Sequence, residues 1–220
     1  MSISRDFIFN KKEGFLTFVG DFEAFYTHEK DPWDQSGDTG EMAPYYAHSR
    51  RRLVSNLKKH DPSSILEVGC GLGFSSNFIK MNLPSADVTG MDISQTAIDS
   101  ATKNFRNCQF KQGSILKEPA PQNHYDCIIL SQLLWYIIHD FSTAMNNCLS
   151  YLNPNGVIII TQAFLKGEQL YAKDFCDGFK GLLSLLESDF SEKLTITFSD
   201  YDEQDNFIHH DGLIILSPKM

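Results

Sequence analysis

The chain has 220 residues, a formal net charge of −9, 42% hydrophobic residues and 12% aromatic residues. This length predicts one structural unit with a sizeable core, and the acidic charge argues against a nucleic-acid backbone as a partner. No apolar run reaches the roughly 18 residues of a membrane span, and the charged start does not resemble a signal peptide, so we expect no membrane partner. The five scattered cysteines indicate reduced thiols in a cytoplasmic protein, and nothing in the sequence indicates an oligomeric state.

The first 40 residues stand apart from the alternating strands and helices that follow. Residues 7–9 and 15–19 are apolar and flank a polar turn at 10–14, which predicts a β-hairpin. The aromatic residues at 22–26 have helical spacing, and a loop rich in turn residues follows at 31–40. We expect either an extension that covers the edge of a sheet or a lid over a ligand.

Residues 44–59 predict a helix that has an apolar stripe including Leu53 and a basic stripe including Arg50. A basic stripe of this kind is usually a solvated face, although one of its members could bind a carboxylate. We therefore divide the chain into residues 1–60, an N-terminal lid or extension with its first helix, and residues 61–220, a ligand-binding domain.

The stretch that organises the rest of the chain is a strand, a glycine turn and a helix. A short apolar run at 65–68 predicts a buried strand, and residues 74–83 have helical spacing. Between them lie three glycines at alternate positions, Gly69, Gly71 and Gly73. Such a turn lets a ligand approach bare backbone, and the following helix presents free N–H groups toward that ligand.

Two ligands of the nucleotide type fit this turn. A second strand at 87–91 ends in Asp92, where a doubly wound sheet places a carboxylate for ribose hydroxyls. A dinucleotide fingerprint would read Gly-x-Gly-x-x-Gly, whereas the glycines here alternate and Glu67 lies two residues before Gly69. An acid at this place has no evident task in a dinucleotide site.

The pattern Glu67-x-Gly69-x-Gly71-x-Gly73 resembles the first motif of the class I methyltransferases that depend on S-adenosyl-L-methionine (SAM). The resemblance covers about residues 60–165. It implies SAM as cofactor and S-adenosyl-L-homocysteine (SAH) as its product. It also implies cofactor contacts along the turn and at the next strand end: Glu67, Gly69, Cys70, Gly71, Gly73, Phe74, Ser75, Asp92 and Ile93.

The N-terminal region carries a second, shorter resemblance. Asp31-Pro-Trp33, followed by Tyr46 and Arg50, is similar to the N-terminal region of nodulation N-methyltransferases, where the segment folds over SAM. The resemblance implies that Trp33, Tyr46 and Arg50 touch the cofactor, with Arg50 facing the methionine carboxylate.

A helix at 95–104 and a short strand at 108–111 come next, before Gly113, Ser114 and Ile115. In the resembled family this position usually carries an acid after a glycine and contacts the adenine. The resemblance therefore implies adenine contacts from these three residues, with the Ser114 hydroxyl in place of a carboxylate.

The strand predicted at 125–130 ends in Ser131, Gln132 and Leu133, which we place near the methyl group because ligands sit outside the carboxyl ends of such strands. This stretch does not resemble the Asn/Asp-Pro-Pro-Tyr/Phe motif of base-directed N-methyltransferases. Ser131 stands where the resembled catechol-type enzymes carry a metal-binding acid, so we predict no metal.

Tyr136 and His139 follow on one helical face and could line a substrate pocket. His139 is our candidate general base, since an imidazole exchanges protons near neutral pH. His28 is a further candidate. The alternative for His139 is a structural contact within its loop.

The remaining residues predict helices at 141–152 and 167–190, a turn at 153–156, and strands at 157–162, 194–198 and 207–216. Leu170 and Phe175 are among the residues expected to face the core. The last two strands are joined by a short acidic connection at 200–205, which demands antiparallel pairing. The expected fold class is α/β: a doubly wound, seven-stranded, mostly parallel sheet with an antiparallel final strand and an N-terminal helical lid.

The resemblance implies a SAM-dependent methyltransferase that moves a methyl group to an oxygen or nitrogen of a polar small molecule. A sugar or amino-sugar derivative is one candidate acceptor. Two alternatives stay open, a non-catalytic subunit that binds SAM and an NAD-dependent oxidoreductase or epimerase.

Overall fold

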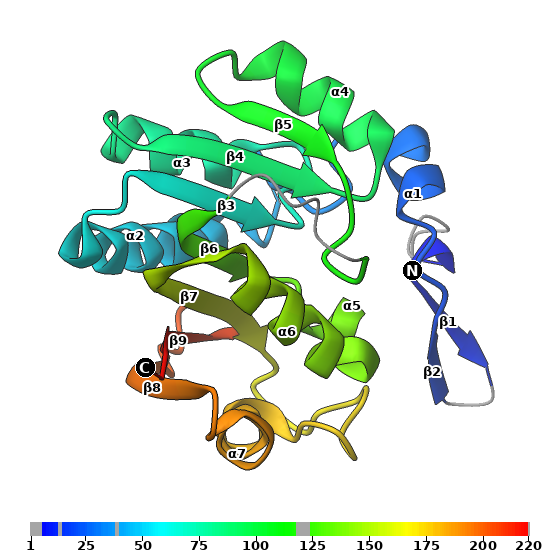
Figure 1. Cartoon of the computed structure of the whole chain (residues 1–220). Helices are drawn as coiled ribbons and strands as arrows, with labels where there is room; N and C mark the ends of the chain where they lie inside the picture. The colour runs from blue at the N-terminus through cyan, green and yellow to red at the C-terminus, as the bar shows by residue number, and fades with distance from the viewer. Residues whose placement is uncertain (1–5, 13–14, 38–39, 118–123, 220) are drawn as a thin grey trace.

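The computed structural model describes residues 6–12, 15–37, 40–117 and 124–219. Its main feature is a seven-stranded sheet in the order β5-β4-β3-β6-β7-β9-β8 (Figure 1). The strands are β3 (Ser64–Val68), β4 (Asp87–Asp92), β5 (Gln109–Gln112), β6 (Tyr125–Ser131), β7 (Leu152–Phe164), β8 (Leu194–Asp202) and β9 (His210–Pro218). Neighbours from β5 to β7 pair in parallel, whereas β9 pairs antiparallel with both β7 and β8. The expected α/β sheet with an antiparallel final strand is confirmed.

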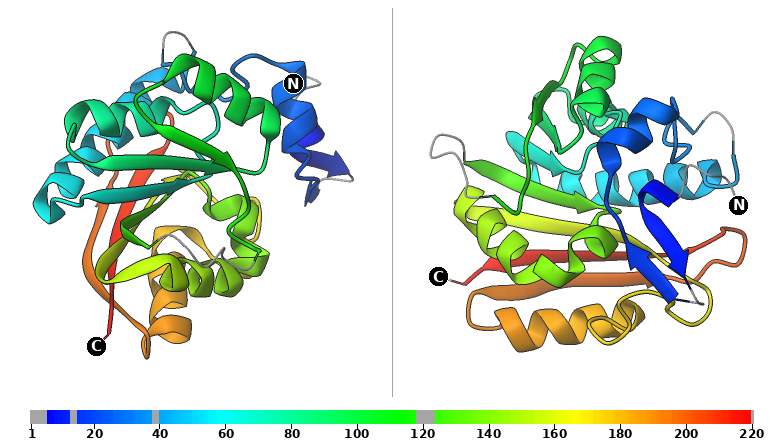
Figure 2. Two further views of the ribbon diagram at one scale, coloured as in Figure 1. Left: turned by 45° about the horizontal axis from the view of Figure 1, so that its top comes forward. Right: turned by 90° about the vertical axis from the view of Figure 1, so that its right-hand side faces the viewer.

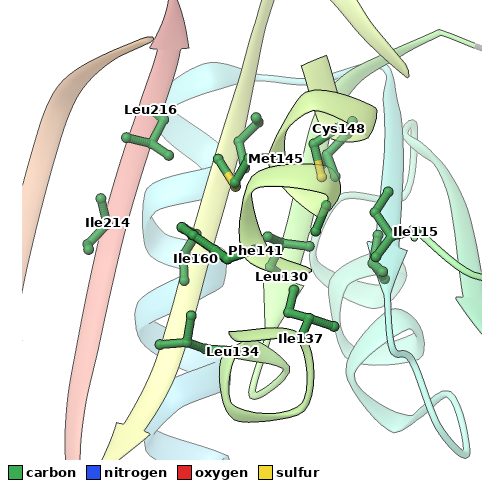
Figure 3. Packing of buried hydrophobic residues seen from close by; sticks show 14 of the residues in the cluster. Ile115, Leu130, Leu134, Ile137, Phe141, Met145, Cys148, Ile160, Ile214 and Leu216 are labelled. Atoms are coloured by element: carbon green, nitrogen blue, oxygen red, sulfur yellow. The ribbon is translucent and has the colours of Figure 1, made fainter. Parts of the chain in front are cut away.

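Helices cover both faces of this sheet. They are α2 (Ala43–His60), α3 (Phe74–Asn82), α4 (Gln95–Asn104), α5 (Leu134–Ile137), a 3-10 turn η2 (Ile138–Asp140), α6 (Phe141–Tyr151) and α7 (Gly178–Phe190). Alternate side chains of the central strands point to opposite faces, which produces two apolar clusters. One cluster lies under α2 and α3, and the other lies under α6 and α7. Figure 3 shows the second cluster, where Phe141, Met145 and Cys148 of α6 pack against Leu130, Ile160 and other apolar residues of the sheet.

The N-terminal residues form a hairpin and a short helix beside the carboxyl ends of the parallel strands. The hairpin pairs β1 (Phe9–Lys12) with β2 (Phe15–Phe18), and α1 (Phe22–His28) follows. Asp21 begins α1 by accepting the N–H of Ala24 at 3.0 Å. Figures 1 and 2 show the hairpin and α1 on the side toward which the arrowheads of β3, β4 and β5 point. The hairpin and helix predictions are confirmed, although the strand extends into the predicted turn, whose residues 13–14 lie outside the described residues.

The predicted helix at 167–190 is wrong over its first half. Only Gly178–Phe190 is helical, and Leu170 and Phe175 are 69% and 53% exposed instead of facing the core. Ala172 has a left-handed φ of 54°, which a right-handed helix does not allow, and Gly178, where α7 begins, has a left-handed φ of 66°. The segment before α7 is therefore an irregular loop at the carboxyl end of β7.

Two predicted boundaries near the end of the sheet also need correction. The predicted turn at 153–156 lies inside β7, where the register shifts between the pairs Tyr125–Leu152 and Cys127–Val157. At the last hairpin, β8 continues to Asp202, which pairs with Asp211, so the connection is 203–209. The strand predicted at 207 begins at His210 instead. The end of β8 and the start of β9 are set by pairing between the two strands, which the local amino-acid composition does not indicate.

All five cysteines are free thiols; Cys108 is partly buried and the others are buried. In the part of the chain that the structure describes, no helix is long and apolar enough to cross a membrane.

Candidate functional site

The glycine turn after β3 is held to the end of the neighbouring strand by its own backbone. The N–H groups of Gly69 and Cys70 both donate to the carbonyl oxygen of Met91, at 2.7 and 3.1 Å. Gly69, Gly71 and Gly73 have φ angles of 72°, 52° and 81°, all in the left-handed region that glycine adopts without strain. The alternation of glycines seen in the sequence is thus the alternation of left-handed residues in the turn.

Gly73 and Gly71 serve different purposes within this turn. A Cβ atom at Gly73 would lie 2.7 Å from the Phe110 ring and 2.9 Å from Ala101, so this glycine permits close packing beneath the turn. A Cβ atom at Gly71 would instead lie 2.5 Å from the Tyr26 hydroxyl and 2.6 Å from Oε1 of Gln35. The turn is therefore faced by side chains from α1 and from the loop that follows α1.

Asp92 is a buried acid at the end of β4. Its two oxygens accept the N–H groups of Gly71 at 2.8 Å and of Ser94 at 2.9 Å. Burial raises the pKa of the Asp92 carboxyl, and these backbone hydrogen bonds offset part of that rise. Since a carboxylate oxygen has two lone pairs, each oxygen can still accept a further donor such as a hydroxyl group.

Glu67 lies within β3 at 2% exposure and accepts a short hydrogen bond from the Ser76 hydroxyl of α3. Burial raises the pKa of the Glu67 carboxyl, whereas the Ser76 and Ser75 hydroxyls and the charge of Arg50 lower it. Glu67 faces a partly enclosed cavity between α2, the glycine turn and the end of β6. The cavity is lined by Gln35, Tyr46, Ser49, Arg50, Glu67, Gly69, Cys70, Ser75, Ser131 and Gln132.

Arg50 supplies the opposite charge in the same cavity. Burial lowers the pKa of the Arg50 guanidinium, and the nearby Glu67 raises it. The guanidinium carbon lies 5.5 Å from the centre of the Tyr46 ring, and burial raises the pKa of that phenol to about 12. An acid and a guanidinium in one cavity can bind a group that carries both an ammonium and a carboxylate.

The end of β6 closes the cavity on the other side. Gln132 has a left-handed φ of 57°, and its side-chain oxygen accepts the N–H of Ala163 at 2.7 Å. Its amide nitrogen donates to the Tyr45 hydroxyl at 2.9 Å, and Tyr45 in turn donates to Asp211 at 2.8 Å. These contacts hold the Gln132 side chain against α2 and fix one wall of the cavity.

The predicted cofactor residue Ile93 and the residues expected around an adenine, Gly113, Ser114 and Ile115, lie along the ends of β4 and β5. Ile93 is 48% exposed, and the N–H of Gly113 donates to the carbonyl of Asp92 at 2.9 Å. The Ser114 hydroxyl accepts the N–H of Leu116 at 3.2 Å, within its own loop. The Ile115 side chain is 3% exposed and belongs to the core, so only its backbone can face a ligand here.

The remaining predicted site residues lie outside the cavity lining. Tyr136 packs among aromatic rings of the N-terminal segment, with its centroid 5.1 Å from Phe22 and 5.8 Å from Trp33. His139 is exposed, and its Nε2 lies 3.0 Å from the Tyr171 hydroxyl. Two predicted cofactor residues, Phe74 and Leu133, pack on the turn itself: Phe74 begins α3, and Leu133 lies 2.8 Å from the Cβ position of Gly69.

His28 stands apart from the site. It is exposed at the end of α1, and its ring centre lies 5.6 Å from that of Phe7. Among the described residues, none of the predicted catalytic candidates lines the cavity.

Sequence reasoning missed Gln35, Ser49 and Tyr26 at this site. Ser49 could have been found, because it precedes Arg50 and lies one helical turn after Tyr45 on α2. Gln35 and Tyr26 carry no local signal, since they reach the glycine turn only through the fold. Over the described ranges, no group of three or more His, Cys, Asp or Glu side chains could hold a metal ion.

Comparison with known proteins places the chain in a family. A family model described as a methyltransferase domain matches residues 59–204. An uncharacterized methyltransferase of Schizosaccharomyces pombe is 29% identical over 134 residues, which is 56% of this chain and 47% of that protein. The malonyl-[acyl-carrier protein] O-methyltransferase of Halalkalibacterium halodurans is 28% identical over 47% of this chain and 40% of its own length. The chain spans about half the length of the curated relatives it matches.

Solved structures share the fold over most of the chain. Magnesium protoporphyrin IX methyltransferase from Synechocystis PCC 6803, with bound SAM, has a TM-score of 0.66 at 14% identity and covers 90% of this chain and 95% of its own. The N-methyltransferase NodS from Bradyrhizobium japonicum WM9, in complex with SAH, has a TM-score of 0.64 at 20% identity, with coverages of 87% and 94%. Because the family model spans most of the sheet, the chain belongs to the methyltransferase domain family and has the class I, Rossmann-like fold of its SAM-dependent members.

Proposed function

We propose that this cavity binds SAM and that the chain transfers the methyl group to an oxygen or nitrogen of a polar small molecule. The observation that carries the proposal is the pairing of Glu67 with Arg50 in one cavity beside the glycine turn. A methionine end carries an ammonium and a carboxylate, and these two side chains complement both charges. A dinucleotide offers neither group and gives Glu67 no partner.

The other predicted cofactor residues extend this arrangement along the strand ends. Asp92 can accept the ribose hydroxyls, because its oxygens keep free lone pairs beside their backbone donors. The adenine would lie against Ile93 and the backbone of Gly113 and Ser114. Bare backbone at Gly69 and Gly71 lets the ligand approach the turn closely.

SAM supplies a sulfonium that gives up its methyl group to an attacking lone pair, leaving SAH. The contribution of this chain is to hold the acceptor in line with the methyl group and to exclude water. Ser131 and Gln132, at the end of β6, are the residues we place beside the transferred methyl group. An amine acceptor needs only its neutral form, whereas a hydroxyl needs a base to take its proton.

The acceptor side of the site is the region above β6 and β7, where Tyr136 and His139 lie with the hairpin β1–β2. Tyr136 would contact the acceptor, and His139 would take a proton from a hydroxyl, with His28 as a further candidate. The relative named trans-aconitate 2-methyltransferase supports a small-molecule acceptor, and the malonyl-[acyl-carrier protein] O-methyltransferase is named for a small acyl group carried on a protein. A sugar or amino-sugar derivative is the first class we would screen, and NodS, which shares the fold and is named as an N-methyltransferase, supports including amines in the screen.

Calorimetric titration with SAM, SAH and NAD⁺ tests the cofactor. We expect SAM and SAH to bind to the wild-type chain and to Asp99→Ala, which removes an exposed acid of α4, and to fail to bind to Asp92→Ala. Thermal melting of each variant shows whether the site alone has changed. Binding of NAD⁺ with neither SAM nor SAH would overturn the proposal in favour of an oxidoreductase or epimerase.

SAM binding without turnover would support the proposed cofactor site but not the proposed methyl transfer. A panel of amines, carboxylates and hydroxyl compounds, assayed with SAM labelled in its methyl group, distinguishes the two outcomes. Labelled product is expected from at least one class. Saturable binding with no labelled product across the panel would indicate a non-catalytic subunit that binds SAM.

A further inference from the structure

The turn at residues 31–35 reaches into the cavity from the N-terminal segment. The carbonyl oxygen of Gln35 accepts a hydrogen bond from Nη2 of Arg50 at 2.6 Å. The side-chain oxygen of Gln35 accepts the N–H of Leu72, in the glycine turn, at 3.2 Å. Both amide atoms of Gln35 also lie within 2.9 Å of where a Cβ atom of Gly71 would stand. Gln35 thus makes three contacts in the site at once. It accepts hydrogen bonds from the Arg50 guanidinium and from the Leu72 N–H, and it covers the backbone of Gly71.

These three groups are the ones that the proposed cofactor needs. Arg50 faces the carboxylate in the proposed function, and Gly71 and Leu72 supply the backbone over which the ligand would lie. Gln35 satisfies them with a carbonyl and an amide that are neutral counterparts of a ligand's oxygens. The Gln35 amide and the Tyr26 hydroxyl of α1 both cover Gly71, so a ligand cannot reach this backbone while the Gln35 amide stays in place.

The turn is held together by its own hydrogen bonds, so it can move as a unit. The two oxygens of Asp31 accept the N–H groups of Gln35 at 2.7 Å and Ser36 at 2.9 Å. The N–H of Asp34 donates to the carbonyl of Asp31 at 3.1 Å. Asp34 has a left-handed φ of 55°, which a residue with a side chain adopts at a cost. Asp31 therefore preorganises Gln35 although its own side chain does not line the cavity.

We propose that the turn at residues 31–35 is an autoinhibitory contact that occupies the cofactor site and must withdraw before the cofactor binds. The inference rests on the proposed SAM function of the same cavity. It goes further because it makes Gln35 a competitor of the cofactor and not one of its ligands. The free energy of withdrawal is subtracted from the intrinsic affinity for the cofactor.

Withdrawal of the turn also changes the acceptor side. Trp33 belongs to the same turn, and its ring lies 4.9 Å from Phe25 and 5.8 Å from Tyr136, measured between ring centres. Tyr136 lies in α5, which follows β6, and we place the acceptor beside Tyr136. Movement of the turn therefore alters the packing around Tyr136, and cofactor binding is coupled to the state of the acceptor pocket.

The chain has two tryptophans, so Trp135→Phe leaves Trp33 as the only indole that reports on the turn. In this background, stopped-flow mixing with SAH should change the fluorescence of Trp33. The observed rate should level off at high SAH concentration, where withdrawal of the turn becomes limiting.

Two variants act on the turn in different ways. Gln35→Ala removes the amide from the site, and Asp31→Ala loosens the turn without removing a cavity side chain. Each should bind SAH more tightly in calorimetry, by roughly threefold to tenfold, which is the effect of losing one hydrogen bond in the competing state. Gln109→Ala, an exposed glutamine on β5, is the matched control and should bind as the wild type does.

The outcomes separate this inference from the function on which it rests. Weaker or unchanged SAH binding by both variants, with normal binding by the wild type and none by Asp92→Ala, would overturn the inference alone. Failure of the wild type and of both variants to bind SAH, with native melting, would overturn the proposed function together with the inference. A fluorescence rate that rises linearly with SAH concentration would also contradict the withdrawal step.

Discussion

Glu67 is a buried carboxyl group, and burial disfavours its charged form. Its side chain is not needed for the backbone pairing of the sheet. It lies in β3 between apolar residues, and its carboxylate accepts a short hydrogen bond from the Ser76 hydroxyl. A buried acid with a raised pKa in a cavity is a feature of functional sites more than of structural ones. The charged form of Glu67 is therefore disfavoured in the folded chain relative to the unfolded chain.

Glu67→Gln should raise stability near neutral pH. Because burial raises the folded-state pKa of Glu67 above the usual 4.5, the folded chain holds more protons than the unfolded chain between those two values. The free energy of unfolding of the wild type therefore falls as pH rises through this window, whereas glutamine does not titrate. We expect the variant to gain roughly 1 kcal/mol at pH 8, or about 2–4 °C in melting temperature.

Melting curves between about pH 5 and pH 8 check the sign of this effect. The advantage of Glu67→Gln should shrink as the pH falls toward 4.5, the ordinary value of this carboxyl. Glu187→Gln, an exposed acid of α7, should show no such trend. A gap between variant and wild type that stays constant with pH would contradict the linkage to Glu67.

His139 is the residue whose chemical role the fold leaves most open to experiment. Its imidazole is exposed and touches the Tyr171 hydroxyl, and its ring centre lies 4.5 Å from that of Phe175. If it removes a proton from a hydroxyl acceptor, His139→Ala should lower turnover by about 10²–10⁴ and leave SAH affinity unchanged. His124→Ala, at the opposite end of β6, is the control, and near-normal turnover by His139→Ala would exclude it as the base.

At the scale of elements, the structure ties α2 to the last hairpin through charged side chains. Arg52 donates to Asp211, which is 2% exposed, and to Asp200 at 2.6 Å. Tyr45, two helical turns before Arg52 on the same face of α2, donates to the other oxygen of Asp211 and accepts from the side chain of Gln132. The position of the cavity wall therefore depends on how α2 is docked against β8 and β9.

Arg52→Ala should destabilise the chain strongly, because it leaves the buried Asp211 carboxylate without its cation. Removing one member of a buried ion pair costs about 3–5 kcal/mol. Arg51→Ala, the exposed neighbour on the same helix, should change the free energy of unfolding by less than about 0.5 kcal/mol. Urea unfolding of both variants measures the difference, and equal losses would show that the Arg52 contacts contribute little.

The loop before α7 shows why some elements escape prediction. Residues 167–177 carry apolar side chains at near-helical spacing, but Leu170 and Phe175 are exposed to solvent. Spacing indicates an amphipathic helix only when a sheet face exists to receive it. By contrast, α4 begins at Gln95 as predicted, because Ser94 caps it through a hydrogen bond to Ala97 that the local sequence encodes.

At the scale of the whole molecule, the βαβ unit around the glycine turn was open to prediction because local signals coincide there. The buried strand, the left-handed glycines and the acid at the next strand end all lie within one continuous stretch. The other half of the cavity is assembled by distant contacts. Gln35 meets Leu72 across 37 positions of sequence, and Tyr45 meets Asp211 across 166, so no local pattern reports either contact.

The burial of the free thiols has a practical meaning for chemical labelling. Only a thiolate reacts readily with an alkylating reagent. Burial raises the pKa of the Cys70 and Cys127 thiols, and the same burial shields both sulfurs from solvent. Burial also raises the pKa of the Cys108 thiol, to about 11, but its side chain is only partly buried, so it would be modified first. Cys70 stands inside the glycine turn and Cys127 inside the central sheet. The order in which the cysteines are alkylated therefore reports which part of the molecule opens first: alkylation of Cys70 reports opening of the glycine turn, and alkylation of Cys127 reports opening of the central sheet.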